Sequence, residues 1–334
     1  MFSDLKMLRM IDDFDETRPE FRGFSDYYRS AIFEGLLALD MQRRATVKVF
    51  ITWVGFGVIL GLIGFGVSMI FGLFGVGVFA GFAGFVLGMS QAEKRMKVVR
   101  LKTKAHLVGG ICQYVGMSFK ADGFEPMKLN SFQNLSLLPK ADRKRFEDQI
   151  TGLAHGAHFT LHEAHLERRD NSDNGSSYKT VFRGILMTLD FPAQFTGTTI
   201  VLRESKFFNR KRKGTLKRVG LADPVFEKAF EAYGSDQVEA RYLLTPTFMQ
   251  RLLDLETIFA GKNLKAAFQG GQLMIVIEAG NQFEVGSMFK PLTQRGRTEK
   301  LLKEIGYVFD IVDTVLKPAT NRVNYRSNVP TNGT

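Results

Sequence analysis

One stretch of the chain carries no charged residue over forty-one consecutive positions, residues 49–89. A bilayer core about 30 Å thick takes about 20 helical residues, so this stretch is too long for one upright span and fits two. A flexible Phe-Gly-Leu-Phe-Gly sequence at residues 71–75 lies near its middle. We therefore expect a two-helix, glycine-rich transmembrane hairpin over residues 49–90, with a very short turn.

Small residues recur at one spacing in both halves of this stretch. Each set falls at positions i, i+4, i+7 and i+11, which places it on one helix face. Small residues let helix backbones approach closely in lipid, where no hydrophobic effect drives the helices together. We expect these faces to form the seam of the hairpin, and the alternative is that they pack between copies in a homo-oligomer. The sets are Gly57, Gly61, Gly64 and Ser68, and Gly77, Gly81, Gly84 and Gly88.

Charge outside the apolar stretch predicts the topology. Lys and Arg residues gather on both sides of it, and cationic loops stay in the cytoplasm. We therefore expect a multi-pass protein of the bacterial inner membrane with both termini in the cytoplasm. Cys112 is the only cysteine, so no intramolecular disulfide can form, in agreement with a reducing compartment.

Two basic segments suit the anionic headgroups of the cytoplasmic leaflet. The net charge is +11, and all of it lies beyond residue 48, because the first 48 residues hold eight basic and nine acidic side chains. Each Lys or Arg at such a surface contributes on the order of 1 kcal/mol. The alternative is a solvated loop, and nucleic acid is disfavoured because few aromatic residues lie nearby. The predicted lipid contacts are Lys94, Arg95, Lys97, Arg100, Lys206, Arg210, Lys211, Arg212 and Lys213.

The remaining segments divide the chain further. In the leader, residues 1–48, Ser25 is a candidate N-cap for a helix that runs into the first span. Residues 91–145 read as a basic juxtamembrane helix, ended by Gly109, Gly110 and Gly116, and a linker. The C-terminal parts are an α+β cytoplasmic domain at residues 146–317 and a disordered tail at residues 318–334.

Alternating apolar and polar positions predict a mainly antiparallel sheet in this domain. His155-Gly156 and Gly270-Gly271 are expected turns, and residues 168–177 are an expected loop tip. Thr245 as N-cap and Pro246 at the first helical position predict a helix. The expected strands cover residues 147–153, 157–167, 178–191, 198–202, 263–268 and 272–278, and the expected helices begin near residues 224, 246 and 298.

The search for catalytic chemistry is mostly negative, because the chain holds no nucleophile elbow, no phosphate-binding loop and no paired cysteines. Four of the five histidines fall within eleven residues. On a helix they would line one face and could bind zinc or another transition metal. On a strand only two share a face, and surface or packed histidines are then the default. The four are His155, His158, His162 and His165.

Three stretches resemble one family. They are Val-Phe-Arg-Gly-Ile-Leu at residues 181–186, the segment 190–199, and the segment 233–246, which contains Asp-Gln-Val-Glu-Ala-Arg-Tyr. Together they resemble the bacterial domain-of-unknown-function family numbered three-one-three-seven, over about residues 100–317. The resemblance implies a membrane anchor ahead of an α+β domain and no activity. It also implies a LemA-type membrane protein as a partner.

Within the third stretch, Asp236, Glu239 and Arg241 are a candidate partner site. The alternative is a structural ion-pair network that fixes the Thr245 helix against the sheet.

The sequence thus predicts a transmembrane α-helical hairpin plus an α+β cytoplasmic domain without a cofactor. The favoured function is an interaction or envelope-associated scaffold whose basic domain lies on the anionic leaflet. One alternative is a membrane-tethered enzyme or metal-binding protein that uses the histidines, although these lack the carboxylate or cysteine companions of a hydrolytic metal site. The other alternative is a lipid-binding module.

Overall fold

A computed structural model describes residues 13–71, 76–126, 128–172, 175–191, 195–203, 216–221, 224–258 and 261–326. The chain divides into two compact units. Unit 1 comprises residues 1–115 and 284–302, and unit 2 comprises residues 116–283 and 303–334.

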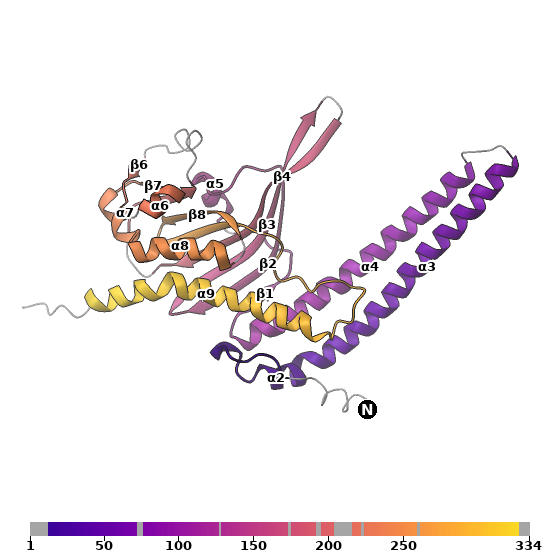
Figure 1. Cartoon of the computed structure of the whole chain (residues 1–334), viewed down its shortest axis with the longest axis horizontal. Coiled ribbons are helices and arrows are strands. Elements are labelled where there is room, and N and C mark those ends of the chain that lie inside the picture. Colours follow the sequence, from indigo (N-terminus) through magenta and orange to yellow (C-terminus); the bar gives the residue numbers. More distant parts are fainter. Residues whose placement is uncertain are drawn as a thin grey trace, which may run out of the picture. The chain divides into compact units, whose positions relative to one another are not determined.

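Two long helices dominate unit 1. A 3₁₀ turn (Pro19–Phe21) precedes α2 (Phe24–Tyr27), which passes through a π-helical turn (Tyr28–Ile32) into α3 (Phe33–Phe71). The second long helix, α4 (Val76–Tyr114), lies beside α3 (Figure 1). The helix ends flank the expected turn, whose residues 72–75 lie outside the described part.

The start of the first helix and the end of the second differ from expectation. Gly23, in the left-handed conformation at φ 81°, is the N-cap, while the Ser25 hydroxyl lies inside α2 and accepts the N–H of Phe14 (2.9 Å). α4 continues through Gly109 and Gly110. A Cβ on Gly110 would lie 2.9 Å from the Ile32 side chain, so this glycine serves close helix packing and does not end the helix.

Buried charges hold residues 284–294 against the helices of unit 1. The Asp40 carboxylate is 3% exposed and accepts Arg43 Nε (2.6 Å) and the N–H of Leu292 (2.9 Å). Arg43 in turn donates to the carbonyl of Met288 (3.0 Å). Arg297 is also buried, and its guanidinium donates to the carbonyls of Val285, Ser287, Lys290 and Pro291.

Unit 2 is built on one nine-stranded sheet in the order β1-β2-β3-β4-β9-β8-β5-β7-β6, and every neighbouring pair is antiparallel. Gly270 and Gly271, with φ of 58° and 74°, make the tight turn between β8 and β9. The strands are β1 (Ser118–Lys120), β2 (Arg143–Ala154), β3 (Ala157–Ser172), β4 (Gly175–Asp190), β5 (Thr199–Arg203), β6 (Lys217–Val219), β7 (Phe230–Gly234), β8 (Lys262–Gln269) and β9 (Gln272–Glu278).

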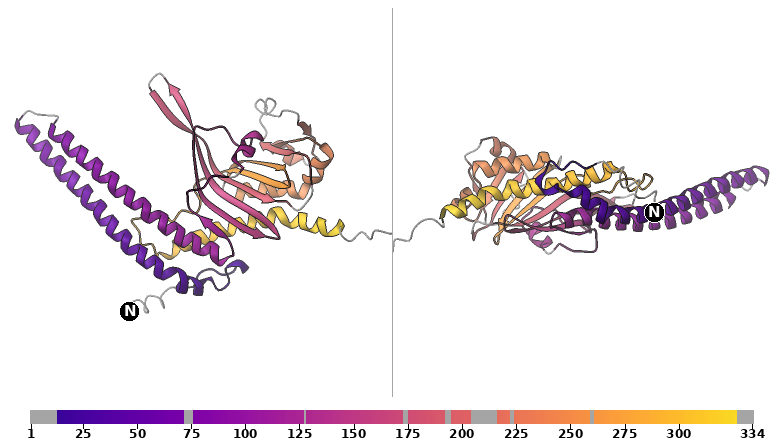
Figure 2. Two further views of the ribbon diagram at one scale, coloured as in Figure 1. Left: turned by 180° about the vertical axis from the view of Figure 1, so that it is seen from behind. Right: turned by 90° about the horizontal axis from the view of Figure 1, so that it is seen from below.

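Both faces of the sheet carry apolar side chains. One face packs with α5 (Leu129–Asn134) in a core that contains Phe132, Leu186 and Val276. The other is covered by α8 (Pro246–Ile258) and α9 (Arg295–Arg326) (Figure 2). Arg251 of α8 joins the two helices by donating to the carbonyl of Thr314 on α9 (2.5 Å). The short helices α6 (Pro224–Ala229) and α7 (Gln237–Leu243) flank β7 in the sequence.

The sheet confirms the expected α+β class, and the Thr245 hydroxyl caps α8 by accepting the N–H of Phe248 (3.2 Å). Two local expectations in unit 2 were wrong. The segment 168–177 is strand up to Ser172 and again from Gly175, because β3 and β4 pair to the edge of the undescribed tip. Residues 318–326 are helical, as α9 continues to Arg326. The three-residue strands β1 and β6 were not expected at all.

We predict that Gly184→Ala destabilises unit 2 by about 3 kcal/mol or more, because no relaxed backbone accommodates the added methyl. A Cβ at Gly184 would overlap the carbonyl oxygen of Ile277 and lie 2.8 Å from Glu278 Cα. Urea unfolding of the purified chain measures the change. The control is Gly220→Ala, where a Cβ would meet nothing within 4 Å. Equal stability of the two variants would contradict the prediction.

Arg297→Lys should cost about 2–4 kcal/mol, because one ammonium cannot satisfy the several buried carbonyls that the guanidinium fork satisfies. The matched control is Arg295→Lys, since Arg295 is exposed and its Nε pairs with Glu299 on the surface (2.5 Å). Urea unfolding and proteolysis of residues 284–294 report the effect. A stable Arg297→Lys chain with this segment protected would refute the role of the guanidinium.

Candidate functional site

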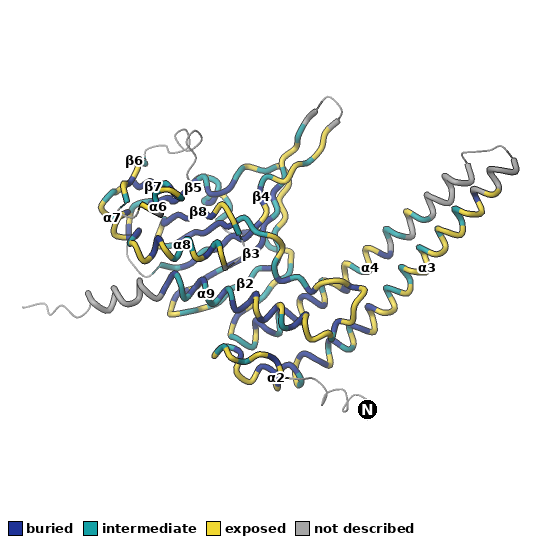
Figure 3. The backbone as a smooth tube through the Cα atoms, viewed as in Figure 1, coloured by how far each residue is buried: buried dark blue, intermediate teal, exposed yellow. Residues whose placement is uncertain are grey.

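The first candidate site is an exposed apolar band on α3. Leu62 and Ile51 are 68% and 59% exposed, although both are large and apolar. Exposed positions recur along the described part of α3 (Figure 3). Contiguous exposed apolar surface marks a contact with membrane or protein. Within the described residues one helical segment, Pro19–Gly64, is long and apolar enough to cross a membrane. The other exposed members of the band are Trp53, Phe56, Val58, Ile59 and Ile63.

The predicted glycine seam is described only in part. A Cβ on Gly57 would lie 2.8 Å from Cγ of Phe85 on α4, so α3 and α4 approach closely there. Gly64 is buried, whereas a Cβ on Gly61 would meet nothing within 4 Å. The surroundings of Ser68, Gly77, Gly81, Gly84 and Gly88 lie outside the described part, so the seam stays a prediction.

The predicted lipid-contacting residues fall into two groups. Lys94, Arg95, Lys97 and Arg100 are all exposed on α4. The second run, which comprises Lys206, Arg210, Lys211, Arg212 and Lys213, lies outside the described residues. Lipid contact by either group stays a prediction.

The histidines do not gather into a site. His155 pairs with Asp313 of α9 (2.5 Å), and His165 bonds the Thr180 hydroxyl (2.8 Å). His158 is exposed, and His162 is buried. Among the described residues, no group of three or more His, Cys, Asp or Glu could hold a metal ion. The segment is strand, which agrees with the default expectation of surface or packed histidines, and metal binding by the four histidines has no support among the described residues.

His162 has a different environment from the other three. Its register partner on β4 is Leu186, a core residue, and the rings of Phe124 and Phe146 lie edge-on to it at 5.8 and 6.0 Å. Neither ring nitrogen has a hydrogen-bond partner among the described residues. Burial lowers the pKa of His162 to about 4, so the imidazole is neutral at pH 7.

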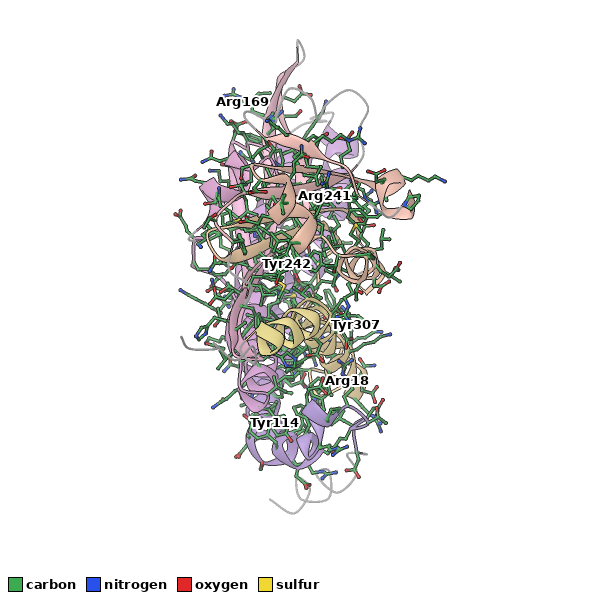
Figure 4. All side chains as sticks on the ribbon, turned by 90° about the vertical axis from the view of Figure 1, so that its left-hand side faces the viewer. Arg18, Tyr114, Arg169, Arg241, Tyr242 and Tyr307 are labelled. Carbon is green, nitrogen blue, oxygen red and sulfur yellow. The ribbon has the colours of Figure 1, made fainter. Side chains whose placement is uncertain are left out.

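The polar residues of the 233–246 stretch bond to backbone. Asp236 caps α7 by accepting the N–H groups of Val238 (2.7 Å) and Glu239 (3.0 Å). Glu239 accepts the N–H of Gly197 (2.8 Å), and Arg241 donates to the carbonyl of Gly220 (3.3 Å) (Figure 4). The expected ion-pair network is thus replaced by side chains that fix two loops, and a partner role for these residues stays a prediction.

Sequence reasoning missed a cavity of about 500 Å³ beside β4. The signal in the sequence was Gly184. Because it has no side chain, the backbone of Ile277 and Glu278 at the end of β9 can lie directly against β4. Arg183 and Lys262 bring positive charge to the cavity, and Glu278 brings negative charge. The lining residues are Thr180, Val181, Phe182, Arg183, Lys262, Glu278, Ala279 and Gly280.

The cavity and α7 lie in the segment that carries the resemblance noted in the sequence. The family model described as Protein of unknown function (DUF3137) matches residues 180–317. The match is confined to these residues, which make up less than half of the chain. The DUF3137 segment begins within β4 and ends within α9, so it covers the part of the sheet from β4 to β6 and both covering helices. It is shorter than the 100–317 expected from the sequence.

Other comparisons add little to the DUF3137 match. A search of curated proteins finds no match. One similar solved structure is the crystal structure of the mycobacterial trehalose monomycolate transport factor A, at 8% identity and a TM-score of 0.32. The match covers 64% of this chain and 95% of that one. At this TM-score the likeness carries no argument about function.

We predict that the buried imidazole of His162 makes stability depend on pH. The unfolded chain takes up the proton near pH 6.5 and the folded chain only near pH 4, so the free energy of unfolding falls as pH drops through this window, by about 3 kcal/mol in total. Below pH 4 both forms are protonated and the loss stops growing. Urea unfolding at several pH values measures it.

His162→Phe should remove this contribution, whereas the exposed His158→Gln control should keep the pH dependence of the parent chain. Identical pH profiles for the parent chain and His162→Phe would show that His162 does not carry the effect.

Proposed function

We propose that this protein is an integral inner-membrane scaffold. In this proposal α3 and α4 cross the bilayer as a hairpin, both termini lie in the cytoplasm, and unit 2 binds other proteins there. The observation that carries the proposal is the exposed apolar band on α3, which no described side chain covers. Such a surface is unfavourable in water and favourable in hydrocarbon.

The charges next to the helices support the orientation. Arg44 precedes the apolar stretch, and Lys94, Arg95 and Lys97 follow it, all of them exposed. The positive-inside rule places both groups on the cytoplasmic side, which requires an even number of crossings. The same residues, with the net positive charge beyond residue 48, favour contact of this part of the chain with anionic headgroups.

A binding role is favoured over catalysis by the chemistry of the described side chains. The polar residues of the DUF3137 motif bond loop backbone, and the histidines are separated. The partners in this proposal are a second copy through the glycine faces and, by family resemblance, a LemA-type membrane protein. The cavity beside β4 has several polar lining residues, which favours a polar ligand over a lipid tail.

Cysteine labelling in intact cells tests the topology. Cys112 is fully buried and is replaced by Ala, and single cysteines are placed at Ser30, Phe74 and Ser177. We expect a membrane-impermeant maleimide to label position 74 alone, because only the connection between the helices faces the periplasm in the proposed hairpin. Labelling all three sites after permeabilisation is the control for reactivity.

Labelling at position 177 in intact cells would place unit 2 in the periplasm and reject the proposed orientation. Protection of position 74 together with extraction of the chain from membranes by carbonate would reject the membrane hairpin itself.

A further inference from the structure

The β3–β4 hairpin extends past its neighbours in the sheet. The last β2–β3 pair is Arg143 with Glu167, and the last β4–β9 pair is Gly184 with Glu278. The residues beyond these pairs, 168–172 and 175–183, are here named the ribbon, and Figure 2 shows its end projecting from the sheet. Strands of 16 residues are much longer than the usual five or six.

On the side of β4 where β9 pairs further down, the edge of the ribbon has no described strand beside it. The carbonyl of Arg183 accepts the N–H of Ala279 (3.2 Å), and this is the last backbone bond between β4 and the chain after β9. No described strand pairs with residues 175–183 on that side. Between Phe182 and Thr180 the register with β3 shifts, so a β-bulge lies at Val181. Bulges re-aim side chains and often lie beside functional sites.

The 500 Å³ cavity lies at this open edge, since Thr180, Val181, Phe182 and Arg183 all line it. The Arg183 side chain is held in place because its Nε donates to Asn281 Oδ1 (2.8 Å). Lys262 supplies a second exposed cation. The one acidic lining residue, Glu278, accepts Asn263 Nδ2 (2.8 Å).

The ribbon itself adds positive charge. Arg168 and Arg169 are exposed on β3 (Figure 4 labels Arg169), and Lys179 is exposed on β4, where its ammonium pairs with Asp170 of β3. At its base, the guanidinium carbon of Arg143 lies 3.4 Å from the centre of the Tyr178 ring, which stiffens the start of the projection.

We propose that the open edge of β4 binds an extended, acidic segment of a partner protein. The partner strand pairs with residues 176–183, and one of its carboxylates enters the cavity between Arg183 and Lys262. Main-chain hydrogen bonds supply affinity in this mode, and pockets for alternate side chains supply specificity. The inference rests on the proposed scaffold function and names its binding surface and the chemistry of its partner.

Charge selects this occupant over a second copy of the chain. Two β4 edges meeting antiparallel would bring the net positive charge of one ribbon against that of the other, because its four cations outnumber its one carboxylate, Asp170, and this costs free energy. An acidic strand meets these cations with opposite charge. The polar ribbon is also unsuited to enter a bilayer.

Selection from a random 12-residue phage-displayed peptide library on the full-length protein in detergent micelles tests the proposal. We expect enrichment of sequences with Asp or Glu at alternate positions. Fluorescence anisotropy of an enriched synthetic peptide should show binding that weakens at least about tenfold in the Arg183→Gln/Lys262→Gln variant. The matched control is Lys228→Gln, because Lys228 is exposed on α6 and does not line the cavity.

A second measurement avoids variants of the protein. Two versions of the peptide are N-methylated, one at the odd-numbered and one at the even-numbered backbone amides. One version should lose binding and the other should keep it, because strand addition uses every second N–H. Hydrogen exchange should slow at residues 176–183 in the complex.

Enrichment of neutral or basic peptides, no enrichment at all, or equal affinity for the Gln variant would overturn the proposal. Preferential binding of the ribbon to an anionic vesicle or a DNA duplex, or a change of oligomeric state in the Gln variant, would assign the surface to another occupant and overturn it as well. Since these measurements use solubilised protein, their outcome is independent of the labelling result for the membrane topology.

Discussion

The backbone of β4 is the constraint on which unit 2 depends. This strand pairs with β3 from Gly175 to Leu189, apart from the bulge at Val181, and with β9 over residues 184–190, and so it joins the two halves of the sheet. Gly184 lies where the second pairing ends, with no room for a side chain against Ile277. The sheet, the cavity and the open edge of the ribbon therefore follow from the position at which β9 stops. The DUF3137 segment begins only four residues earlier.

In unit 1, buried charged side chains hold an irregular segment in place. Asp40 and Arg43 lie one helical turn apart on α3, whereas Arg297 is distant in the sequence, and together they hold residues 284–294 through backbone groups. Removing charges from water is costly, so such groups persist when their hydrogen bonds are satisfied. Arg297 is suited to this because its planar fork reaches several carbonyls at once. Apolar packing alone would not fix the path of a segment with so many carbonyls facing inward.

The sequence predicted the elements whose signals are local. Thr245 and Pro246 mark the start of α8, and Gly270-Gly271 marks the turn between β8 and β9. Strands β1 and β6 carry no such signal, because three residues become a strand only by pairing with a distant neighbour. Residues 168–177, the outer part of the ribbon, were assigned to a loop for a related reason, since polarity indicates exposure and an exposed hairpin is as polar as a loop.

The candidate sites show the same division between local and distant signals. The apolar stretch and its basic flanks are properties of composition, so the sequence identified them directly. The four histidines are close in the sequence, but their positions on the strand differ in burial. His162 is buried beside the Phe146 ring, whereas His158 is exposed. The hydrogen bond from the N–H of Leu292 to Asp40 and the cavity beside Gly184 both arise from residues that only folding brings together.

In the proposed scaffold, the sheet edge and the membrane hairpin place different demands on the same chain. An apolar helix is retained in a bilayer by any sequence that is apolar enough, so a hairpin of α3 and α4 would supply location without supplying specificity. A strand edge next to a charged cavity has the opposite property, since backbone pairing accepts many sequences and only the cations discriminate among them. Natural proteins usually cover or charge such edges to prevent aggregation. In the proposed mode, the net positive charge of the ribbon, with Arg183 at the cavity, disfavours self-pairing in this way while leaving the edge available to a strand of opposite charge.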